Sequence, residues 1–570
     1  MDRKEMNPAG TVVSIAPGRG GAAAGRPARR SILPANRPGL GNPWLTLVAA
    51  VFGLLMIGLD STIVSVANPT IGRHFHATLP DLQWVTNAYL LALSVTLIFG
   101  GKLGDLLGRK RIFLIGTAGF ALASLAAGLS TSLGELIAFR AAQGVFGAIM
   151  VPQTLATLRV TFPIEKLAMA IGLWTMSSSI GIASGPIVGG VLINHASWRW
   201  IFIVNVPVGA LSLLVGTWVL RESRDQAEGR RFDPPGIALL SGMLFALVWG
   251  LIDAEKHGWG NFTPYAWLIG AAGLLALFIG WEIREERIRH PHIPLSLFRS
   301  PQFSSGVLMA LSTFTAFYAV TFFVTLYLQR VHGYSASQTG VRLLALTGVM
   351  GISAFAGSRV VSRYGPPLPL LVGALFYAAG LIGLSRLGPD TPFSSIWPYL
   401  ALVGLGFGPT QTGFSRAIVG GAPPRYGGIA GGLQSTAVQV GGMLGLSVLG
   451  SVIVSRVSST LPHKLTQAGV PAHLTHQLAG TAHQLAGTAH SVAQGLVPIP
   501  AGVPTSVAHA ITRGSQLAFT AGLDRAMTIA AVIVGVTGVV AFVASALGAR
   551  RPAVAATPRE AIAEPSRRAA

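Results

Sequence analysis

The stretch GGKLGDLLGRKR at residues 100–111 decides how this chain folds. It joins two apolar segments, residues 83–101 and 112–130, each about as long as a helix needs to cross a bilayer. Its glycines permit a tight turn, and Asp105 stands where the start of a following helix would favour an anion. The glycines concerned are Gly101, Gly104 and Gly108, and the closing basic residues are Arg109, Lys110 and Arg111. The stretch is therefore predicted to be a basic turn between two membrane-spanning helices.

The composition of the whole chain requires lipid as a solvent. Of 570 residues, 51% are hydrophobic and only 11% are charged, and the mean hydropathy is +0.58. An average soluble domain carries about 25% charged residues. Reading for apolar runs of about 20 residues gives about fourteen spans. They lie near 44–66, 83–101, 112–130, 135–155, 168–192, 199–220, 236–252, 264–282, 303–328, 338–361, 367–386, 395–415, 428–455 and 525–547.

Basic residues recur in every second loop between these spans, whereas most of the other short loops hold one or none. This asymmetry predicts an even number of spans, a multi-pass protein of the inner (plasma) membrane, and both termini in the cytoplasm. The net charge of +21 is thereby explained without a nucleic-acid partner. The chain has no cysteine, which excludes thiol chemistry and cysteine-held metals. We expect no enzyme, no metal and no cofactor, and no GxxxxGK stretch for ATP is present.

The spans group into domains. Residues 44–220 are predicted to form a six-helix bundle and residues 302–547 a second one, with a linker at 221–301 that holds two extra spans. Residues 1–43 are expected to be a disordered cytoplasmic tail, and residues 548–570 a second cytoplasmic tail. Residues 456–524 are expected to form a long outer loop, which contains the tandem repeat HQLAGTA at 476–482 and 483–489. Its histidines, His476, His483 and His490, recur every seven residues and would share one helical face. A metal strip is conceivable, but a duplication in a tolerant loop is favoured.

Two small-residue motifs indicate repeated halves. GIASGPIVGG at 181–190 places three glycines four apart, so that a neighbouring backbone can pack against one face, while its proline removes a helix hydrogen bond. The residues concerned are Gly181, Gly185, Pro186, Gly189 and Gly190. Ala437, Gly441 and Gly445 repeat the spacing in the second half. GSRVVSRYG at 357–365 echoes the stretch at 100–111 without its acid.

Two ionisable residues lie well inside the spans of the first half, namely Asp60 and Arg140. Both are at a similar depth from the outer end of their helices, so they could face each other. A carboxylate held between desolvation and a neighbouring arginine can change its charge with the state of the cavity, which suits proton coupling. A static ion pair that fixes helix packing is the alternative.

These motifs together resemble the major facilitator superfamily. The loop at 100–111 is similar to its gating loop, in which Asp105 and Arg109 would lock the cytoplasmic side, and 181–190 resembles its antiporter signature. LDSTIVSVANPTI at 59–71, WRWIFIVNVPVG at 198–209 and YLQRVHGYSASQTGVRLL at 327–344 resemble the fourteen-span drug:proton antiporters of the EmrB/QacA type. The first of these departs from the family pattern at Ser65 and Asn68. RAAQGVFGAIMVP at 140–152 resembles the fourth-helix motif associated with proton transfer.

The resemblance implies an all-α transporter of two six-helix bundles plus two inserted helices. It implies export of lipophilic drugs or toxic compounds across the cytoplasmic membrane in exchange for protons. A dedicated exporter of one metabolite or self-made antibiotic is the alternative. A periplasmic adaptor would be a partner in a host with an outer membrane.

The second half offers a cavity no deep acid, because Arg287 to Pro389 contains no Asp or Glu. We therefore expect neutral or monocationic amphipathic substrates. Aromatic side chains of the helix near 303–328 would hold them, or would face lipid or a neighbouring helix instead. They are Phe314, Phe317, Tyr318 and Phe322.

Overall fold

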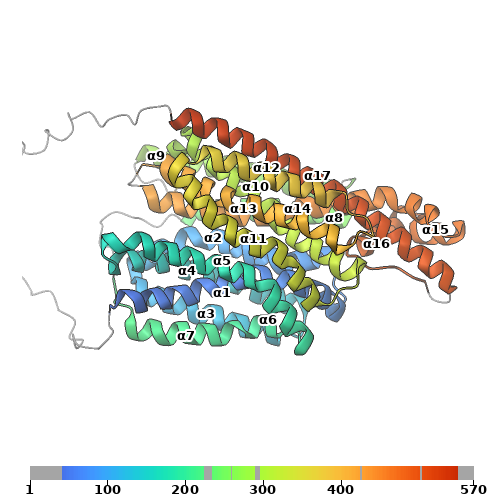
Figure 1. Ribbon diagram of the computed structural model, residues 1–570, viewed down its shortest axis with the longest axis horizontal. Coiled ribbons are helices and arrows are strands. Elements are labelled where there is room, and N and C mark those ends of the chain that lie inside the picture. Colours follow the sequence, from blue (N-terminus) through green and yellow to red (C-terminus); the bar gives the residue numbers. More distant parts are fainter. Residues whose placement is uncertain are drawn as a thin grey trace, which may run out of the picture.

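The computed structural model describes residues 41–223, 234–257, 260–288, 295–423, 426–500 and 503–549. The expectations for residues 1–40 and 550–570 of the two tails lie outside this part. The described residues form long helices that run side by side, without a strand (Figure 1). The predicted all-α class is confirmed.

The first bundle begins at an N-cap, where the side chain of Asn42 accepts a hydrogen bond from the backbone of Trp44 and a proline occupies the first turn. Its helices are α1 (Pro43–Phe75), α2 (Leu79–Leu107), α3 (Arg109–Leu129), α4 (Leu133–Thr161), α5 (Ile164–His195), the short α6 (Trp200–Ile203) and α7 (Asn205–Val219). Ser132 and Glu135 form a capping box at the start of α4.

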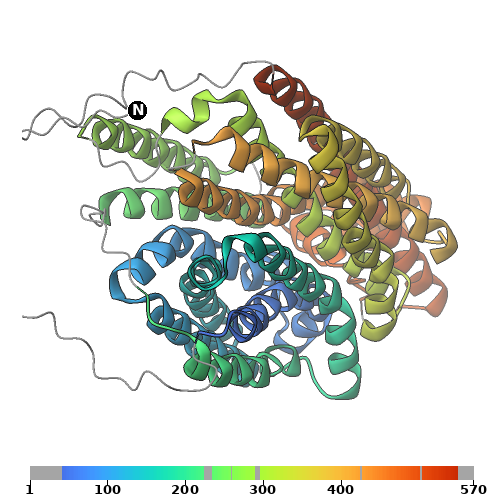
Figure 2. The same cartoon turned by 60° about the vertical axis from the view of Figure 1, so that its left-hand side comes forward.

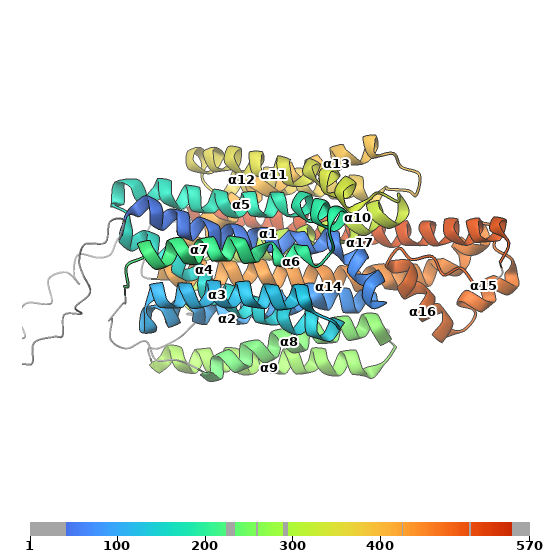
Figure 3. The ribbon, with the colours of Figure 1, turned by 90° about the horizontal axis from the view of Figure 1, so that it is seen from below.

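The inserted helices are α8 (Pro234–His257) and α9 (Phe262–Ile288), which pack against each other. Figure 3 places them along one side of the molecule, opposite α5 and α11. The second bundle follows the 3-10 helix η1 (Leu295–Arg299) and consists of α10 (Pro301–Leu326), the π-helix η2 (Tyr327–Val331), α11 (Ala336–Tyr364), α12 (Pro367–Ser385), α13 (Phe393–Gly421), α14 (Gly427–Gln467) and α17 (Thr505–Ala549).

Twelve spans within the described residues are long and apolar enough to cross a membrane. Helices α2 and α13, with 29 residues each, pack in the two bundles beside them. The structure therefore accommodates the fourteen predicted spans, and the chain is a multi-pass membrane protein.

The expected loop at 456–524 is wrong, because most of it is helical. Helix α14 has 41 residues and α17 has 45, so each is longer than the roughly 20 residues that cross a bilayer. Between them lie α15 (Ala472–Ala479) and α16 (Ala482–Ala493), which project beyond the bundles at one end (Figure 1). We call this end the hairpin end, and the opposite end, which carries the turn at Gly108, the loop end.

The two copies of the repeat adopt different structures. In the first copy, Gly480 ends α15 and Thr481 caps α16, whereas the second copy runs through α16 without a break. Thr488 of the second copy donates a hydrogen bond of 2.7 Å to the carbonyl of Leu478. His476 and His490 therefore lie on different helices, and the predicted common face is wrong. No group of three metal-binding side chains occurs among the residues that the structure describes.

The two bundles touch at the hairpin end and separate toward the loop end. We call the α5–α11 and α2–α14 boundaries between them the seams. A β-carbon on Gly340 of α11 would overlap the backbone of Pro186 in α5, whereas one on Gly351, three turns nearer the loop end on the same face, would meet nothing within 4 Å. On the other seam, a β-carbon on Gly442 of α14 would lie 3.0 Å from Leu90, whereas one on Gly431 would again meet nothing within 4 Å. Both seams are therefore closed at the hairpin end and open at the loop end. Figure 2 gives a second view of the two bundles.

Candidate functional site

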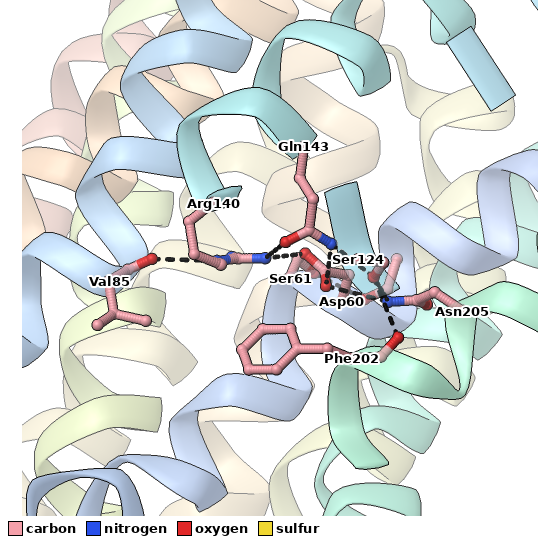
Figure 4. Close-up of polar contacts among 9 residues, drawn as sticks. Asp60, Ser61, Val85, Ser124, Arg140, Gln143, Phe202 and Asn205 are labelled. Atoms are coloured by element: carbon pink, nitrogen blue, oxygen red, sulfur yellow. Dashed lines mark hydrogen bonds and ion pairs between the residues drawn. The ribbon is translucent and has the colours of Figure 1, made fainter. Parts of the chain in front are cut away.

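Asp60 and Arg140 form a buried ion pair in the middle of the first bundle (Figure 4). Asp60 lies on α1 and Arg140 on α4, and the distance from Nη1 of Arg140 to Oδ2 of Asp60 is 2.6 Å. Their side chains are 0% and 1% exposed. The structure thus brings together the two charges whose positions in the sequence predicted a pair.

Arg140 is held by further groups on α2 and α4. Its Nε donates to the carbonyl of Val85 at 3.1 Å, and its Nη1 donates to Oε1 of Gln143 at 3.0 Å. The guanidinium also lies 4.3 Å from the ring centre of Tyr89. A planar guanidinium can satisfy these directions together, which a lysine ammonium cannot do.

The second carboxylate oxygen of Asp60 faces two amides that the sequence analysis did not single out. Asn205 on α7 donates to Oδ1 of Asp60 at 3.2 Å, and Gln143 approaches the same atom at 3.4 Å. Both amides also donate to the hydroxyl of Ser124 on α3, at 2.9 and 2.7 Å. Ser124 in turn donates to the carbonyl of Phe202 at 3.1 Å. The carboxylate therefore accepts hydrogen bonds from α4 and α7, and Ser124 on α3 accepts a hydrogen bond from each of the two amides (Figure 4).

Two of the missed residues were within reach of sequence reasoning. Gln143 lies one turn after Arg140 on the same helix, and Asn205 lies in the quoted stretch 198–209. A buried amide in a membrane bundle needs partners, and a carboxylate is its strongest available acceptor. Ser124 carries no comparable signal, because serine is common in packed membrane helices.

The predicted gating loop is an abrupt turn between α2 and α3. Gly108 has φ 112°, a conformation that side chains rarely adopt, and a β-carbon on Gly101 would lie 3.7 Å from Pro152 of α4. Arg109 reaches back one turn to Asp105, with Nη2 and Nε at 2.9 and 3.1 Å from the same oxygen.

One expectation for this loop is wrong. Asp105 lies in the last turn of α2 and not at the start of α3. The start of α3 is occupied by Glu222, whose carboxylate accepts hydrogen bonds from the backbone of Lys110 and Arg111 at 3.1 and 3.3 Å. The helix dipole favours an anion there, and the segment after α7 supplies it.

The motif at 181–190 forms two contacts at once. Gly181, Gly185 and Gly189 pack on α1. A β-carbon on Gly181 would lie 2.7 Å from the carbonyl of Leu55, and one on Gly189 would lie 2.7 Å from the side chain of Ile63. Pro186 and Gly190 instead face α11 at the closed seam. The predicted packing face is present, and the seam contact was not foreseen.

The second half repeats the first contact. A β-carbon on Gly441 of α14 would overlap the carbonyl of Leu311 in α10, and one on Gly445 would overlap that of Thr315. Helices α10 and α14 therefore pack as α1 and α5 do, which supports two repeated halves.

The four aromatic residues predicted to line a cavity are buried between helices. Phe314 and Phe317 lie 5.3 and 4.9 Å from the ring centre of Phe407 on α13, and Tyr318 is 7% exposed. Phe322 is 3% exposed and packs on Phe323. In this conformation they contact neighbouring helices, so their role as substrate walls stays a prediction.

The profile described as Major Facilitator Superfamily matches residues 50–446. A "Tetracenomycin C resistance and export protein" of Streptomyces glaucescens is 44% identical over 508 residues, which cover 89% of this chain and 91% of the relative. A "Multidrug resistance protein Stp" of Mycobacterium tuberculosis is 35% identical over 436 residues, covering 76% and 80%. Among solved structures, the inward-facing, unoccupied bacterial homologue of the human lysosomal transporter Spinster has a TM-score of 0.60 at 17% identity, covering 91% of this chain and 100% of that one.

Proposed function

Because this chain belongs to the major facilitator superfamily, we propose that it exports lipophilic drugs or antibiotics from the cell in exchange for protons. The names of the relatives support the direction and the kind of cargo, since one is a resistance and export protein and another a multidrug resistance protein. The buried Asp60–Arg140 pair is the observation that carries the coupling to protons.

Loop charge supports an orientation with the loop end in the cytoplasm. The turn at 108–111 and the segment at 221–222 lie at the loop end and hold Arg109, Lys110, Arg111 and Arg221. Such clusters favour the cytoplasmic side, so the hairpin end is outside. The open loop-end seams then make this conformation an inward-facing one.

Protonation of Asp60 would act on both seams through short connections. Arg140 is bonded to the carbonyl of Val85, and Gln83 and Asn87 on the same helix donate to Leu446 and Ser447 of α14 at 3.1 Å each. Neutralising Asp60 would remove the counter-ion of Arg140 and so change the balance between its contact with α1 and its contact with α2.

On the other side, Thr62 lies two residues after Asp60 and donates to the carbonyl of Ile182 in α5 at 2.9 Å. The next carbonyl, that of Ala183, accepts from Thr347 of α11 at 3.2 Å. One or two hydrogen bonds therefore connect each seam to α1 or α4, the helices that carry Asp60 and Arg140. One proton entering along the membrane potential supplies about 2.3 kcal/mol per 100 mV.

Neutral compounds fit the site better than cations do. Both oxygens of Asp60 are occupied and the side chain is 0% exposed, so this carboxylate is not available to a bound cation in the inward-facing state. In the described residues of the second bundle, the acids are Asp390 in a loop and Asp524 on α17. The energetic cost of an unpaired cation in such a cavity favours neutral substrates.

Asp60→Asn tests the coupling. The amide preserves the shape and cannot titrate, so exchange of labelled compound across vesicles without a gradient should continue, whereas proton-driven accumulation should fall at least about tenfold. Tetracenomycin C is the first compound to use. Accumulation that persists at the unmodified level would reject Asp60 as the coupling group.

The dedicated-exporter alternative rests on the relative that shares 44% identity and is named for one compound. A resistance panel in a pump-deficient host separates the two. Protection against one compound alone supports the dedicated exporter, and protection against several unrelated lipophilic compounds supports multidrug export.

A further inference from the structure

The π-helix η2 of the second bundle is bonded to α1 of the first bundle at the hairpin end. Nε2 of Gln329 donates to the carbonyl of Val66 at 3.0 Å. Nη2 of Arg330 donates to the carbonyl of Pro69 at 2.8 Å. We call these two hydrogen bonds the latch. They cross from one bundle to the other, so they must break when the hairpin end opens in alternating access.

Contacts within the second bundle hold η2 in place. The hydroxyl of Tyr327, its first residue, donates to the carbonyl of Gly388 at 2.7 Å. The carbonyl of Val331, its last residue, accepts from Gln516 on α17 at 3.3 Å. The backbone N–H of His332 donates to the carbonyl of Tyr327 at 3.3 Å, which closes the π-turn. Because a π-turn is rare and short, the position of the latch depends on the residue that ends it.

His332, the residue that ends η2, is packed between aromatic rings. Its ring lies 4.9 Å from the ring centre of Tyr327 and 5.4 Å from that of Tyr334, to which it is nearly parallel at 7°. The guanidinium of Arg342 on α11 lies 3.8 Å from the ring centre of Tyr334. Nε2 of His332 is buried and has no hydrogen-bond partner among the described residues. A proton on this ring would therefore have no acceptor and would bring a second cation to Tyr334.

The surroundings of His332 disfavour its protonation while the latch is closed. Burial lowers the pKa of His332 below its ordinary value of about 6.5, and the positive charge of Arg342 lowers it further. Asp390 acts in the opposite direction, but its carboxylate is paired with Arg513 of α17. The titratable and charged side chains on the elements around His332 are Tyr327, Arg330, Tyr334, Arg342, Asp390 and Arg513.

We propose that His332 is an acid sensor of the outer face, which releases the latch when the pH outside the cell falls. The proposal rests on the proposed transport function, which supplies the orientation and the state that opens to the outside. In that state the imidazole would meet water and titrate near its ordinary pKa. The open form is therefore stabilised as the pH falls below about 6.5, and the gain is complete below the lowered pKa of the closed form.

Such a sensor would match the opening of the hairpin end to the supply of protons. A chain that exchanges cargo for protons works with the more acidic medium outside. Acid at the hairpin end would favour the state in which cargo can leave and a proton can enter. At higher pH the neutral ring would keep η2 in place and the hairpin end closed.

Labelling of a buried cysteine measures this opening directly. Ser447 of α14 is 0% exposed and accepts a hydrogen bond from Asn87 across the α2–α14 seam. The chain has no native cysteine, so Ser447→Cys can react with a water-soluble maleimide only when that seam opens. The protein is held in lipid nanodiscs without cargo and at one pH on both sides. Every variant also carries Asp60→Asn, so that Asp60 cannot contribute to the pH response.

The comparison variant is His332→Phe, which keeps a ring against Tyr327 and Tyr334 but cannot take a proton. Thiols react more slowly at low pH, so each rate is divided by that of His332→Phe at the same pH. This ratio should rise about threefold or more between about pH 7.5 and about pH 5.5. His332→Gln in place of His332→Phe should give the same rise. His473→Gln, which changes an exposed histidine at the same end, is the matched control and should keep it.

Gln329→Met tests the latch separately from the sensor. It removes the hydrogen bond to Val66 and should raise the labelling rate at both pH values. A ratio that stays constant or falls toward low pH would show that His332 does not release the latch. Labelling that Gln329→Met leaves unchanged would show that the latch does not hold the hairpin end closed. Either result overturns the proposal, and neither depends on proton-driven export, which the accumulation assay tests by itself.

Discussion

Replacing Arg140 by methionine should destabilise the protein far more than removing a partly buried charge from the first bundle. Arg140 is 1% exposed and donates to Asp60, Gln143 and the carbonyl of Val85. Methionine keeps most of the apolar volume and removes all three hydrogen bonds. Breaking a buried ion pair by removing one partner costs about 3–5 kcal/mol, because the other charge is left buried without compensation.

The double variant Asp60→Asn/Arg140→Met separates this cause from lost packing. It has no buried charge, so it should melt at a higher temperature than Arg140→Met alone, although it carries one substitution more. Arg199→Met is the control, because Arg199 is only partly buried and donates one hydrogen bond, to Ser130 at 3.1 Å, worth about 1 kcal/mol. The assay is the unfolding temperature of the purified protein, followed by tryptophan fluorescence. An unpaired buried charge is not the cause if Arg140→Met melts no earlier than Arg199→Met, or if the double variant is no more stable than Arg140→Met.

Three further outcomes are expected. Gly340→Leu should prevent closure of the hairpin-end seam, because the leucine side chain would overlap Pro186. Transport should fall about tenfold or more at normal expression. Gly270→Leu on α9 is the control and should transport normally, because a β-carbon there meets nothing within 4 Å. Single cysteines at positions 105 and 480 should label only from the inside and only from the outside, respectively, in intact cells, and the reverse pattern would invert the orientation. Asn205→Leu should reduce proton-driven accumulation severalfold while leaving gradient-free exchange intact, because Asp60 loses a donor that orients it; equal loss of both activities would assign Asn205 a purely structural role.

The spans could be predicted because a membrane imposes a length and a composition on each helix. The helices within residues 456–524 could not be predicted in this way, because the criterion of length and composition applies only to segments inside the bilayer. Residues 472–493 include six Ala and three Leu, which are good helix formers, and Thr481 with Gln484 forms a capping box. The sequence therefore contained a helix propensity in this segment. It was predicted to be a loop because it is too polar to meet the criterion for a membrane span.

The candidate site was predictable only where charges lie. Asp60 and Arg140 stand out because a charge in a bilayer demands a partner, and equal depth on two helices made them partners. Ser124 and the anion at the start of α3 were not predictable, because their roles depend on which helices become neighbours. Glu222 lies 112 residues from Lys110 in sequence, and nothing local indicates that they meet.

The repeated halves share their packing but not their chemistry. Gly181, Gly185 and Gly189 bring α5 onto α1, and Gly441 and Gly445 bring α14 onto α10 in the same way. At the level of Asp60 in α1, however, α10 offers the aromatic residues Phe314, Phe317 and Tyr318. A buried carboxylate needs a polar shell that a lipophilic cargo would disturb, and an aromatic wall would leave a carboxylate without donors. If Asp60 carries the proton and these aromatic residues hold the cargo, their placement in different halves would let each keep its own surroundings, and the seams between the halves would carry the effect of one on the other.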